Sequence, residues 1–166
     1  MINIVLLEPE MPANTGNIGR TCVATGARLH LIDPLGFHLD EKSLKRAGMD
    51  YWERVDYRRY IDLQDFLESN GNPRLFMATT KAEKSYTEVE YGKDAYIMFG
   101  KESAGIPEEL LVGNRENCIR IPMLGDTRSL NLSNSVAIIL YEALRQNCFE
   151  MLSKKGSLHR LSWEQQ

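Results

Sequence analysis

The sequence lacks a long hydrophobic run. Its uninterrupted apolar segments, such as IVLL at residues 4–7 and VAIIL at residues 136–140, are far shorter than the roughly 20 residues that a membrane-spanning helix requires. Met1 leads directly into a strand-like pattern, without the features of a signal peptide. We therefore expect a cytoplasmic protein that has no membrane partner.

Cysteine and histidine are scarce, and they are scattered along the chain: Cys22, Cys118, Cys148, His30, His38 and His159. None of the cysteines has a second cysteine or a histidine at the spacing of zinc ligands. We expect all three cysteines to be reduced and structural. The histidines indicate neither a metal site nor a Ser-His-Asp hydrolase, so we predict that no metal is used.

Two common phosphate-binding motifs are missing as well. The loop after the first strand-like run reads EPEMPANTGNIGR at residues 8–20, which is neither the GxGxxG fingerprint of dinucleotide-binding folds nor the GxxxxGK[ST] loop of nucleotide triphosphatases. An ordinary nucleotide- or flavin-binding domain therefore remains only a minor alternative.

Positive charge is not in excess, because 20 Lys and Arg residues face 23 Asp and Glu residues and the net charge is −3. This balance argues against a protein that coats nucleic acid by bulk electrostatics. Two local basic clusters stand out, at residues 42–48 with Arg54, Arg58 and Arg59, and at residues 154–160. They could hold a polyanion, or they could be solvated helix faces and a loose tail.

Strand-like and helix-like patterns alternate along the 166 residues. The strand-like runs cover residues 2–7, 28–32, 74–79, 95–99 and 118–122, and the helix patterns lie near residues 15–26, 40–47, 61–69, 107–112 and 131–147. The alternation predicts an α/β fold with a mainly parallel sheet flanked by helices. We expect one domain over residues 1–153, followed by a C-terminal tail over residues 154–166.

An unusually polar segment, residues 128–135, lies at the start of the last helix pattern. The apolar face of this helix is made by Leu132, Val136, Ile139, Leu140 and Ala143. Ser129, Asn131 and Ser133 are all competent N-cap residues, yet one helix uses only one N-cap. The surplus indicates a ligand, and the alternative is one cap within an ordinary polar loop.

Arg20 lies on the first helix pattern. It is about 200° around that helix from the apolar Ile18, so it points away from its own core. Gly16 and Gly19 beside it permit close approach of another backbone, as a binding site would require. A solvated surface arginine is the alternative.

Glu102 lies between Gly100 and Gly105, on the loop that follows the fourth strand-like run. A carboxylate in such a loop is either solvated or paired. If it is paired, Arg20 or Arg128 is the natural partner.

Three motifs stand in fixed order: NTGNIGR at 14–20, MFGKESAGIP at 98–107 and IPMLGDTRSLNLSNSVAIILYEALRQ at 121–146. With these motifs, the chain resembles the SPOUT superfamily of knotted RNA methyltransferases over most of its length. It is most similar to the minimal enzymes that methylate the ribose 2′-oxygen of the tRNA wobble nucleotide, a cytidine or modified uridine at position 34.

The resemblance implies a deep C-terminal trefoil knot, an exception to the general absence of knots in proteins. It implies that crossing loops bind S-adenosylmethionine through positions that match Ala78, Gly100, Ile121, Ser129 and Leu130. It also implies a homodimer, with the helices at 15–26 and 131–147 in the interface, and tRNA bound through its anticodon region. A different RNA target, or a non-catalytic RNA-binding protein on the same fold, remains an alternative.

The resemblance further implies catalytic roles for Arg20 and Asn131, and substrate-binding or site-orienting roles for Asn14, Glu102, Arg128 and Tyr141. The family assigns the matching arginine a part in activating the 2′-oxygen. Because a guanidinium is effectively always protonated, we interpret Arg20 as a donor that stabilises oxyanion character or grips the adjacent phosphate. Asn131 and Ser129 would orient Arg20 or the ribose. The resemblance assigns no residue as the acceptor of the 2′-hydroxyl proton.

Overall fold

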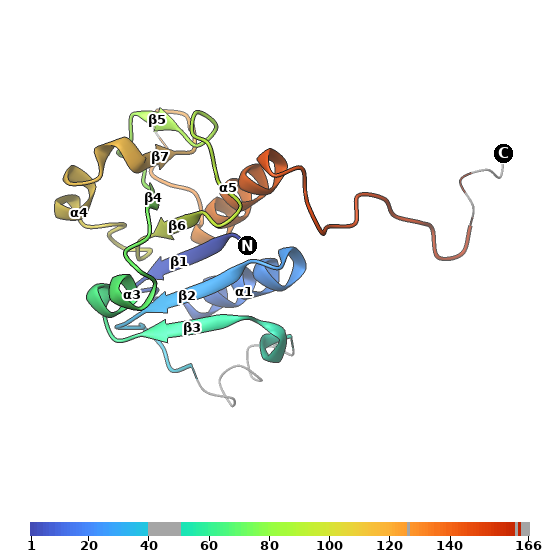
Figure 1. Cartoon of the computed structure of the whole chain (residues 1–166), viewed down its shortest axis with the longest axis horizontal. Helices are drawn as coiled ribbons and strands as arrows, with labels where there is room; N and C mark the ends of the chain where they lie inside the picture. Colours follow the sequence, from blue (N-terminus) through green and yellow to red (C-terminus); the bar gives the residue numbers. More distant parts are fainter. Residues whose placement is uncertain (40–50, 126, 162, 164–166) are drawn as a thin grey trace.

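The computed structural model describes residues 1–39, 51–125, 127–161 and 163. Its strands are β1 (Asn3–Leu7), β2 (Arg28–Ile32), β3 (Tyr57–Tyr60), β4 (Leu75–Ala78), β5 (Lys84–Ser85), β6 (Tyr96–Phe99) and β7 (Cys118–Arg120). They form a seven-stranded sheet in the order β3-β2-β1-β6-β4-β7-β5 (Figure 1). All the strand pairs in this sheet are parallel, so the prediction of an α/β fold on a mainly parallel sheet is confirmed.

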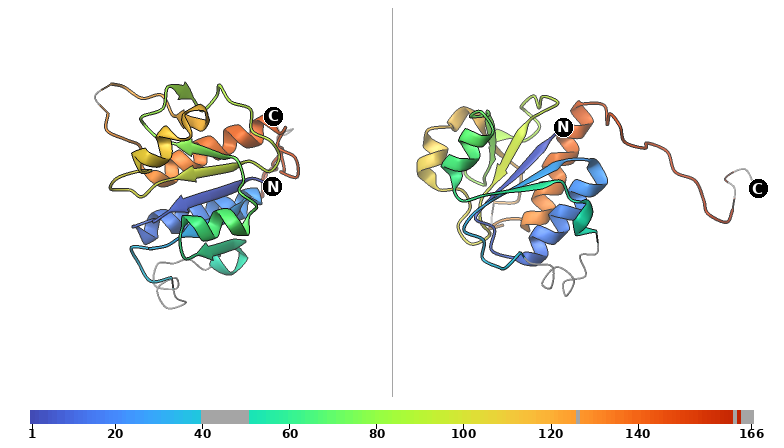
Figure 2. Two further views of the ribbon diagram at one scale, coloured as in Figure 1. Left: turned by 60° about the vertical axis from the view of Figure 1, so that its left-hand side comes forward. Right: turned by 60° about the horizontal axis from the view of Figure 1, so that its bottom comes forward.

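Helices cover both faces of the sheet (Figure 2). One face carries α1 (Pro12–Thr25) and α5 (Leu132–Gln146), and the other carries α3 (Leu63–Ser69) and α4 (Glu108–Val112). Two short 3₁₀ segments, η1 (Trp52–Arg54) and η2 (Arg115–Asn117), complete the described elements. The helix that we predicted at residues 40–47 lies outside the described residues. Within those residues, no helix has the length and apolarity needed to cross a bilayer.

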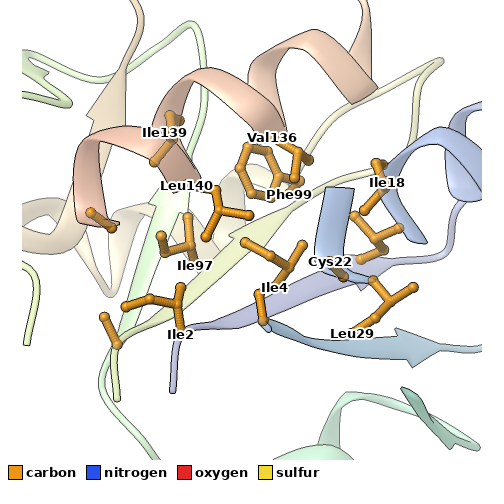
Figure 3. Close-up of a cluster of buried hydrophobic side chains, with 14 of the residues drawn as sticks. Ile2, Ile4, Ile18, Cys22, Leu29, Ile97, Phe99, Val136, Ile139 and Leu140 are labelled. Atoms are coloured by element: carbon orange, nitrogen blue, oxygen red, sulfur yellow. The ribbon is translucent and has the colours of Figure 1, made fainter. Parts of the chain in front are cut away.

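The larger core lies between the sheet and the pair α1 and α5 (Figure 3). Successive strand residues face opposite sides of a sheet, so Ile2 and Ile4 point to this face, whereas Val5 and Leu7 belong to the core under α3 and α4. Both faces of β1 are therefore buried, which explains why residues 4–7 of this strand are an unbroken apolar run. From α5, Val136, Ile139, Leu140 and Ala143 fill this core as the sequence predicted, and Leu132 packs against it while only partly buried; α1 adds Ile18 and Cys22.

The three cysteines are free thiols, as expected. Cys22 and Cys118 are buried, and burial raises the pKa of both thiols, that of Cys22 to about 12. Both thiols are therefore inert structural groups.

The structure adds two strands that the sequence did not predict, β3 and β5. Both lie at the edges of the sheet. Strand β3 reads YRRY with three exposed residues, and β5 has only two residues. Neither has the apolar run by which we recognised the others.

The bounds of α1 and β7 differ from those predicted. Helix α1 begins at Pro12 rather than near residue 15, because proline fits the first helical position, and it ends before Gly26, whose φ of 70° is left-handed. Strand β7 ends at Arg120, so Ile121 belongs to the following loop.

The turn after β6 folds back tightly on its own start. Lys101 and Gly105 form an antiparallel bridge, and the Gly105 N–H donates to the Lys101 carbonyl at 2.8 Å. A Cβ atom on Gly100 would lie 2.0 Å from the Gly105 carbonyl carbon and 2.2 Å from the Ile106 nitrogen. Gly100 is therefore required by the backbone packing of this turn.

A buried histidine anchors β2 to its neighbours. The His30 side chain is fully buried, with Nδ1 2.8 Å from the Tyr60 hydroxyl and Nε2 3.1 Å from Asn3 Oδ1. The Asn3 amide nitrogen donates to main-chain carbonyls, so its Oδ1 is the acceptor and His30 donates from Nε2. Burial, together with the charges of Arg28 and Arg58, lowers the pKa of His30 to about 4.

The first prediction concerns acid stability. In the unfolded chain His30 has its usual pKa of about 6.5, so between pH 6.5 and 4 the unfolded state binds more protons than the folded state. The free energy of unfolding should therefore fall as the pH drops through this window, by about 3 kcal/mol from this group. Urea denaturation should show a smaller difference in the free energy of unfolding between pH 7 and pH 4 for His30→Gln than for wild type. His38→Gln, at an exposed imidazole, should keep the wild-type difference. If His30→Gln keeps the full wild-type difference, the lowered pKa of His30 is not the cause of the acid destabilisation.

The second prediction concerns the turn after β6. Gly100→Ala should lower the free energy of unfolding by about 3 kcal/mol, because its methyl group meets backbone atoms that belong to a tight turn. The matched control is Gly113→Ala, since Gly113 has φ −71° and a Cβ there meets atoms only at 3.9 Å and beyond. The control should be neutral or slightly stabilising. Equal denaturation midpoints for the two variants would refute the packing argument.

Candidate active site

A pocket of about 520 Å³ lies beyond the carboxyl ends of β4, β6 and β7. Ligands commonly bind at this edge of parallel sheets, and the volume is in the range of small-molecule sites. Its walls come from residues 78–81, residues 99–106, the segment between β7 and α5 and the first half of α5, with Met11 and Asn14 added from the N-cap and first turn of α1. The pocket is therefore assembled from segments that are distant in the sequence.

Most of the predicted site residues meet in this pocket. It is lined by the five predicted cofactor contacts, Ala78, Gly100, Ile121, Ser129 and Leu130, and by Asn14, Glu102, Arg128 and Asn131. Arg20 and Tyr141 are not among its lining residues. The three sequence motifs thus converge in space, apart from these two side chains.

A chain of side-chain hydrogen bonds joins three of the pocket segments. The Asn131 amide nitrogen donates to Asn14 Oδ1 at 3.0 Å, and the Asn14 amide nitrogen donates to Glu102 Oε1 at 2.9 Å. We call Asn131, Asn14 and Glu102 the amide relay. Asn14 is buried, where an unsatisfied amide would cost about 1–3 kcal/mol. The relay therefore fixes α1, the turn after β6 and the start of α5 relative to one another.

The polar segment at the start of α5 both caps the helix and lines the pocket. Asn131 is the N-cap, and its Oδ1 accepts from the backbone N–H of Ser133 at 2.9 Å and from the Ser133 hydroxyl at 2.7 Å. Ser129 and Leu130 line the pocket together with Asn131. The surplus of cap-forming residues is thus explained by a cavity beside the helix start. Asn131 makes its side-chain contacts with Asn14 and the cap, not with Arg20.

The predicted partner of Glu102 was wrong. Neither Arg20 nor Arg128 pairs with it; its carboxylate accepts from the backbone N–H of Glu10 at 2.8 Å, from that of Met11 at 3.3 Å and from Asn14. The start of α1 presents backbone N–H groups that have no partner within the helix, and a carboxylate is a favourable acceptor there.

Arg20 is exposed on α1 and points away from the core, as predicted. Its guanidinium carbon lies 5.7 Å from the centre of the Tyr51 ring, within the range of a cation–π contact. The expectation for Gly19 was wrong, because a Cβ there would lie 2.7 Å from a ring carbon of Trp52. Gly19 therefore makes room for a tryptophan side chain rather than for another backbone.

The sequence did not single out the loop after β4, where Thr79, Thr80 and Lys81 line the pocket. Its position at the carboxyl end of a buried strand was the available signal. Lys81 Nζ lies 2.8 Å from Glu108 Oε1 across the rim, and both side chains are largely exposed, so this ion pair contributes little stability.

Acidic groups gather beside the turn after β6. Lys101 Nζ donates to Glu8 Oε2 at 2.7 Å, and this hydrogen bond raises the pKa of the Lys101 ammonium. Hydrogen bonds from Ser103 hold the pKa of the Glu10 carboxyl below its usual value. Among the residues that the structure describes, no group of three or more His, Cys, Asp and Glu side chains could hold a metal ion.

Several methyltransferases are similar to this chain in sequence and in fold. The tRNA (cytidine(34)-2'-O)-methyltransferase of Escherichia coli strain K12 is 50% identical over 147 residues, which cover 88% of this chain and 94% of that enzyme. A solved structure that concerns the 2-OH methylation of C/U34 on tRNA is 45% identical, with a TM-score of 0.82, and the match covers 89% of this chain and 97% of that chain.

An AdoMet-bound rRNA methyltransferase from Sinorhizobium meliloti is more distant, at 26% identity and a TM-score of 0.74, over 92% of this chain and 57% of that one. The model of the SpoU rRNA Methylase family matches residues 1–141. The chain therefore belongs to the SpoU family of RNA methylases.

Proposed function

We propose that this protein transfers a methyl group from S-adenosylmethionine to the ribose 2′-hydroxyl of the tRNA wobble nucleotide, a cytidine or modified uridine at position 34. The observation that carries the proposal is the 50% identity to a tRNA (cytidine(34)-2'-O)-methyltransferase over 94% of that enzyme. The convergence of the three motifs on one pocket supports it independently. Since tRNA is the substrate, we expect the enzyme to work in the cytoplasm.

The pocket suits S-adenosylmethionine. Its volume of about 520 Å³ is adequate, and Gly100, Gly105 and the acidic residue Glu102 line it. A carboxylate is compatible with the positive sulfonium of this cofactor, whereas the loops lack the motifs that hold nucleotide phosphates. The relative from Sinorhizobium meliloti binds AdoMet. When bound, the cofactor supplies the methyl group and an uncharged leaving group, so no acid is needed for its departure.

The chain's own residues would orient the ribose and stabilise its oxygen. Ser129 and Arg128 line the pocket and are exposed, so they can donate to a ribose or a phosphate. Arg20 would stabilise the developing oxyanion or grip the adjacent phosphate. Alignment of the 2′-oxygen with the methyl group is the main requirement for the rate.

We propose that the enzyme is a homodimer formed through α1 and α5. Arg20 lies outside the pocket of its own chain, and α5 exposes the apolar side chains Ile138 and Tyr141, the latter 47% exposed. A dimer through these helices would cover that surface and could supply the partner subunit's Arg20 to the pocket. It would also combine the basic side chains of two copies for binding the anticodon region of tRNA.

We retain the prediction of a deep C-terminal trefoil knot within residues 1–153. Two observations support it: β7 lies between β4 and β5 in the sheet, and the segment that follows β7 shares the pocket with residues 99–106. Of the proposed tail, residues 154–161 and 163 are exposed, and Figure 1 shows this segment leaving the body of the molecule.

The experiment that tests the function is mass mapping of ribose methylation in total tRNA from cells with and without the protein. We expect a 2′-O-methyl group at position 34 that depends on the protein. Purified protein and S-adenosylmethionine should restore it to tRNA from the deficient cells. Methylation at another nucleotide would contradict the proposed substrate, and no change in any RNA would favour a non-catalytic role.

Arg20→Ala should lower the single-turnover rate of methyl transfer about 10²-fold or more, which corresponds to roughly 2.7 kcal/mol of transition-state stabilisation. The melting temperature and the Kd for S-adenosylmethionine should hardly change, because Arg20 is exposed and outside the pocket. Arg20→Lys should not restore the rate, since a point charge does not replace a planar fork of donors. A wild-type rate in Arg20→Ala would remove Arg20 from the mechanism.

Mixed dimers distinguish whether Arg20 serves its own pocket or that of the neighbouring copy. Ser129→Trp should fill the pocket and abolish activity while leaving Arg20 intact. If Arg20 acts across the dimer, mixing Arg20→Ala with Ser129→Trp should regenerate one working site per mixed dimer. Activity that stays absent after subunit exchange would place Arg20 with its own pocket.

A further inference from the structure

The loop that enters α1 and the turn after β6 lie side by side because β1 and β6 are adjacent parallel strands. Each segment has a carboxylate that accepts hydrogen bonds from the other segment. Glu10 Oε2 accepts from the Ser103 backbone N–H at 2.9 Å, and Glu10 Oε1 accepts from the Ser103 hydroxyl at 2.8 Å. In return, Glu102 accepts from the Glu10 backbone N–H at 2.8 Å. We call Glu10, Ser103 and Glu102 the carboxylate clamp.

We propose that Glu10 is a positioning residue that holds the turn after β6 in the conformation that binds S-adenosylmethionine. The inference rests on the proposed function, which puts that cofactor in the pocket. Glu10 is not among the pocket-lining residues, whereas residues 101–105 all are. Glu10 therefore acts through Ser103 rather than by touching the cofactor.

The turn depends on contacts from outside itself. Ser103, Ala104 and Gly105 are exposed, and Gly105 has a left-handed φ of 72°. Within the turn, the backbone hydrogen bond from Gly105 to Lys101 closes the loop. Ordering a backbone residue costs about 1–2 kcal/mol of conformational entropy, so a short exposed turn needs further hydrogen bonds to keep one shape. Glu10 supplies two of them to Ser103, at the tip of the turn.

The backbone around Glu10 is held in place by its neighbours. The Pro9 carbonyl accepts from the Gly36 N–H at 2.9 Å, and a Cβ on Gly36 would lie 2.7 Å from the Glu10 Cα. The backbone at Glu10 is thus packed against residue 36 on one side and bound by Glu102 on the other. The loop before α1 is therefore the fixed part, and the turn is the part that it holds.

The arrangement of charges argues that these hydrogen bonds matter. Glu8 and Glu10 contact the turn, which itself carries Glu102, and Lys101 of the turn forms an ion pair with Glu8. Like charges brought close together oppose the arrangement. Charge-assisted hydrogen bonds, which are shorter and stronger than neutral ones, offset that repulsion at Glu10 and Glu102. An apolar residue at position 10 would avoid the repulsion but would leave the Ser103 N–H without this acceptor.

The test is calorimetric titration of the purified full-length protein with S-adenosylmethionine, together with steady-state kinetics on tRNA. Glu10→Ala should raise the Kd and KM for S-adenosylmethionine about tenfold, equivalent to about 1.4 kcal/mol. The kcat and the KM for tRNA should stay within about twofold. Ser103→Ala should have a smaller effect in the same direction, and Ser103→Thr, which keeps the hydroxyl, should bind like wild type.

The double variant Glu10→Ala with Ser103→Ala should bind no more weakly than Glu10→Ala, because the hydroxyl hydrogen bond that Ser103→Ala removes is already lost in Glu10→Ala. The matched control is Glu150→Ala, which removes a carboxylate from an exposed ion pair with Lys93 at 2.7 Å and should leave the Kd unchanged. Ser103→Ala removes only a hydroxyl, so it still provides the test if Glu10→Ala lowers the melting temperature.

An unchanged Kd in Glu10→Ala and Ser103→Ala would overturn the inference. Strictly additive effects in the double variant would do so as well, as would a loss of kcat at unchanged KM. If wild-type protein fails to bind S-adenosylmethionine, the proposed function fails first and the inference fails with it. These results are distinguishable, because only the last one appears in the wild-type titration.

Discussion

The hydrogen bond between the side chains of Asn131 and Asn14 joins residues that are 117 positions apart in the sequence. Each amide also makes a second contact that defines a structural element. The Asn131 oxygen caps α5, and the Asn14 nitrogen reaches Glu102 in the turn after β6. Because Asn14 is buried, its donor and acceptor need partners within the protein. The pocket therefore has one arrangement in which all of these groups are satisfied.

The parallel sheet brings these groups within reach of one another. Strands β2 and β3 extend the sheet on one side of β1, and β6, β4, β7 and β5 extend it on the other. The order reverses between β1 and β6, and at such a point two loops leave the sheet in different directions and open a crevice. Here Glu10 and Ser103 bridge those two loops. The pocket opens on the β6 side of that bridge, under the turn that the bridge holds.

Much of this could be predicted from the sequence, for identifiable reasons. Buried parallel strands read as apolar runs, so all five strand-like runs appear in the sheet, and the three motifs named residues that meet in the pocket. Strand β3 was not predicted because it lies at the edge of the sheet, where it can expose Arg58 and Arg59 and so lacks an apolar run. Two of the partners of Glu102 were not predicted because they are backbone N–H groups, which every non-proline residue has, and the third is the side chain of Asn14, 88 positions away. The ring beside Arg20 comes from Tyr51, about 30 residues away, and no periodicity within α1 could indicate it.

The sheet order also determines when the fold can be completed during synthesis. Strands β1 and β2 pair residues that are close in the sequence, such as Asn3 with Arg28, whereas β1 meets β6 through Asn3 and Tyr96. Such long-range parallel pairing is intrinsically slow. One edge of β1 therefore stays open on the nascent chain until β6 has emerged from the ribosome. An unpaired strand edge is a template for wrong pairing, so this edge is where aggregation or capture by a chaperone would begin.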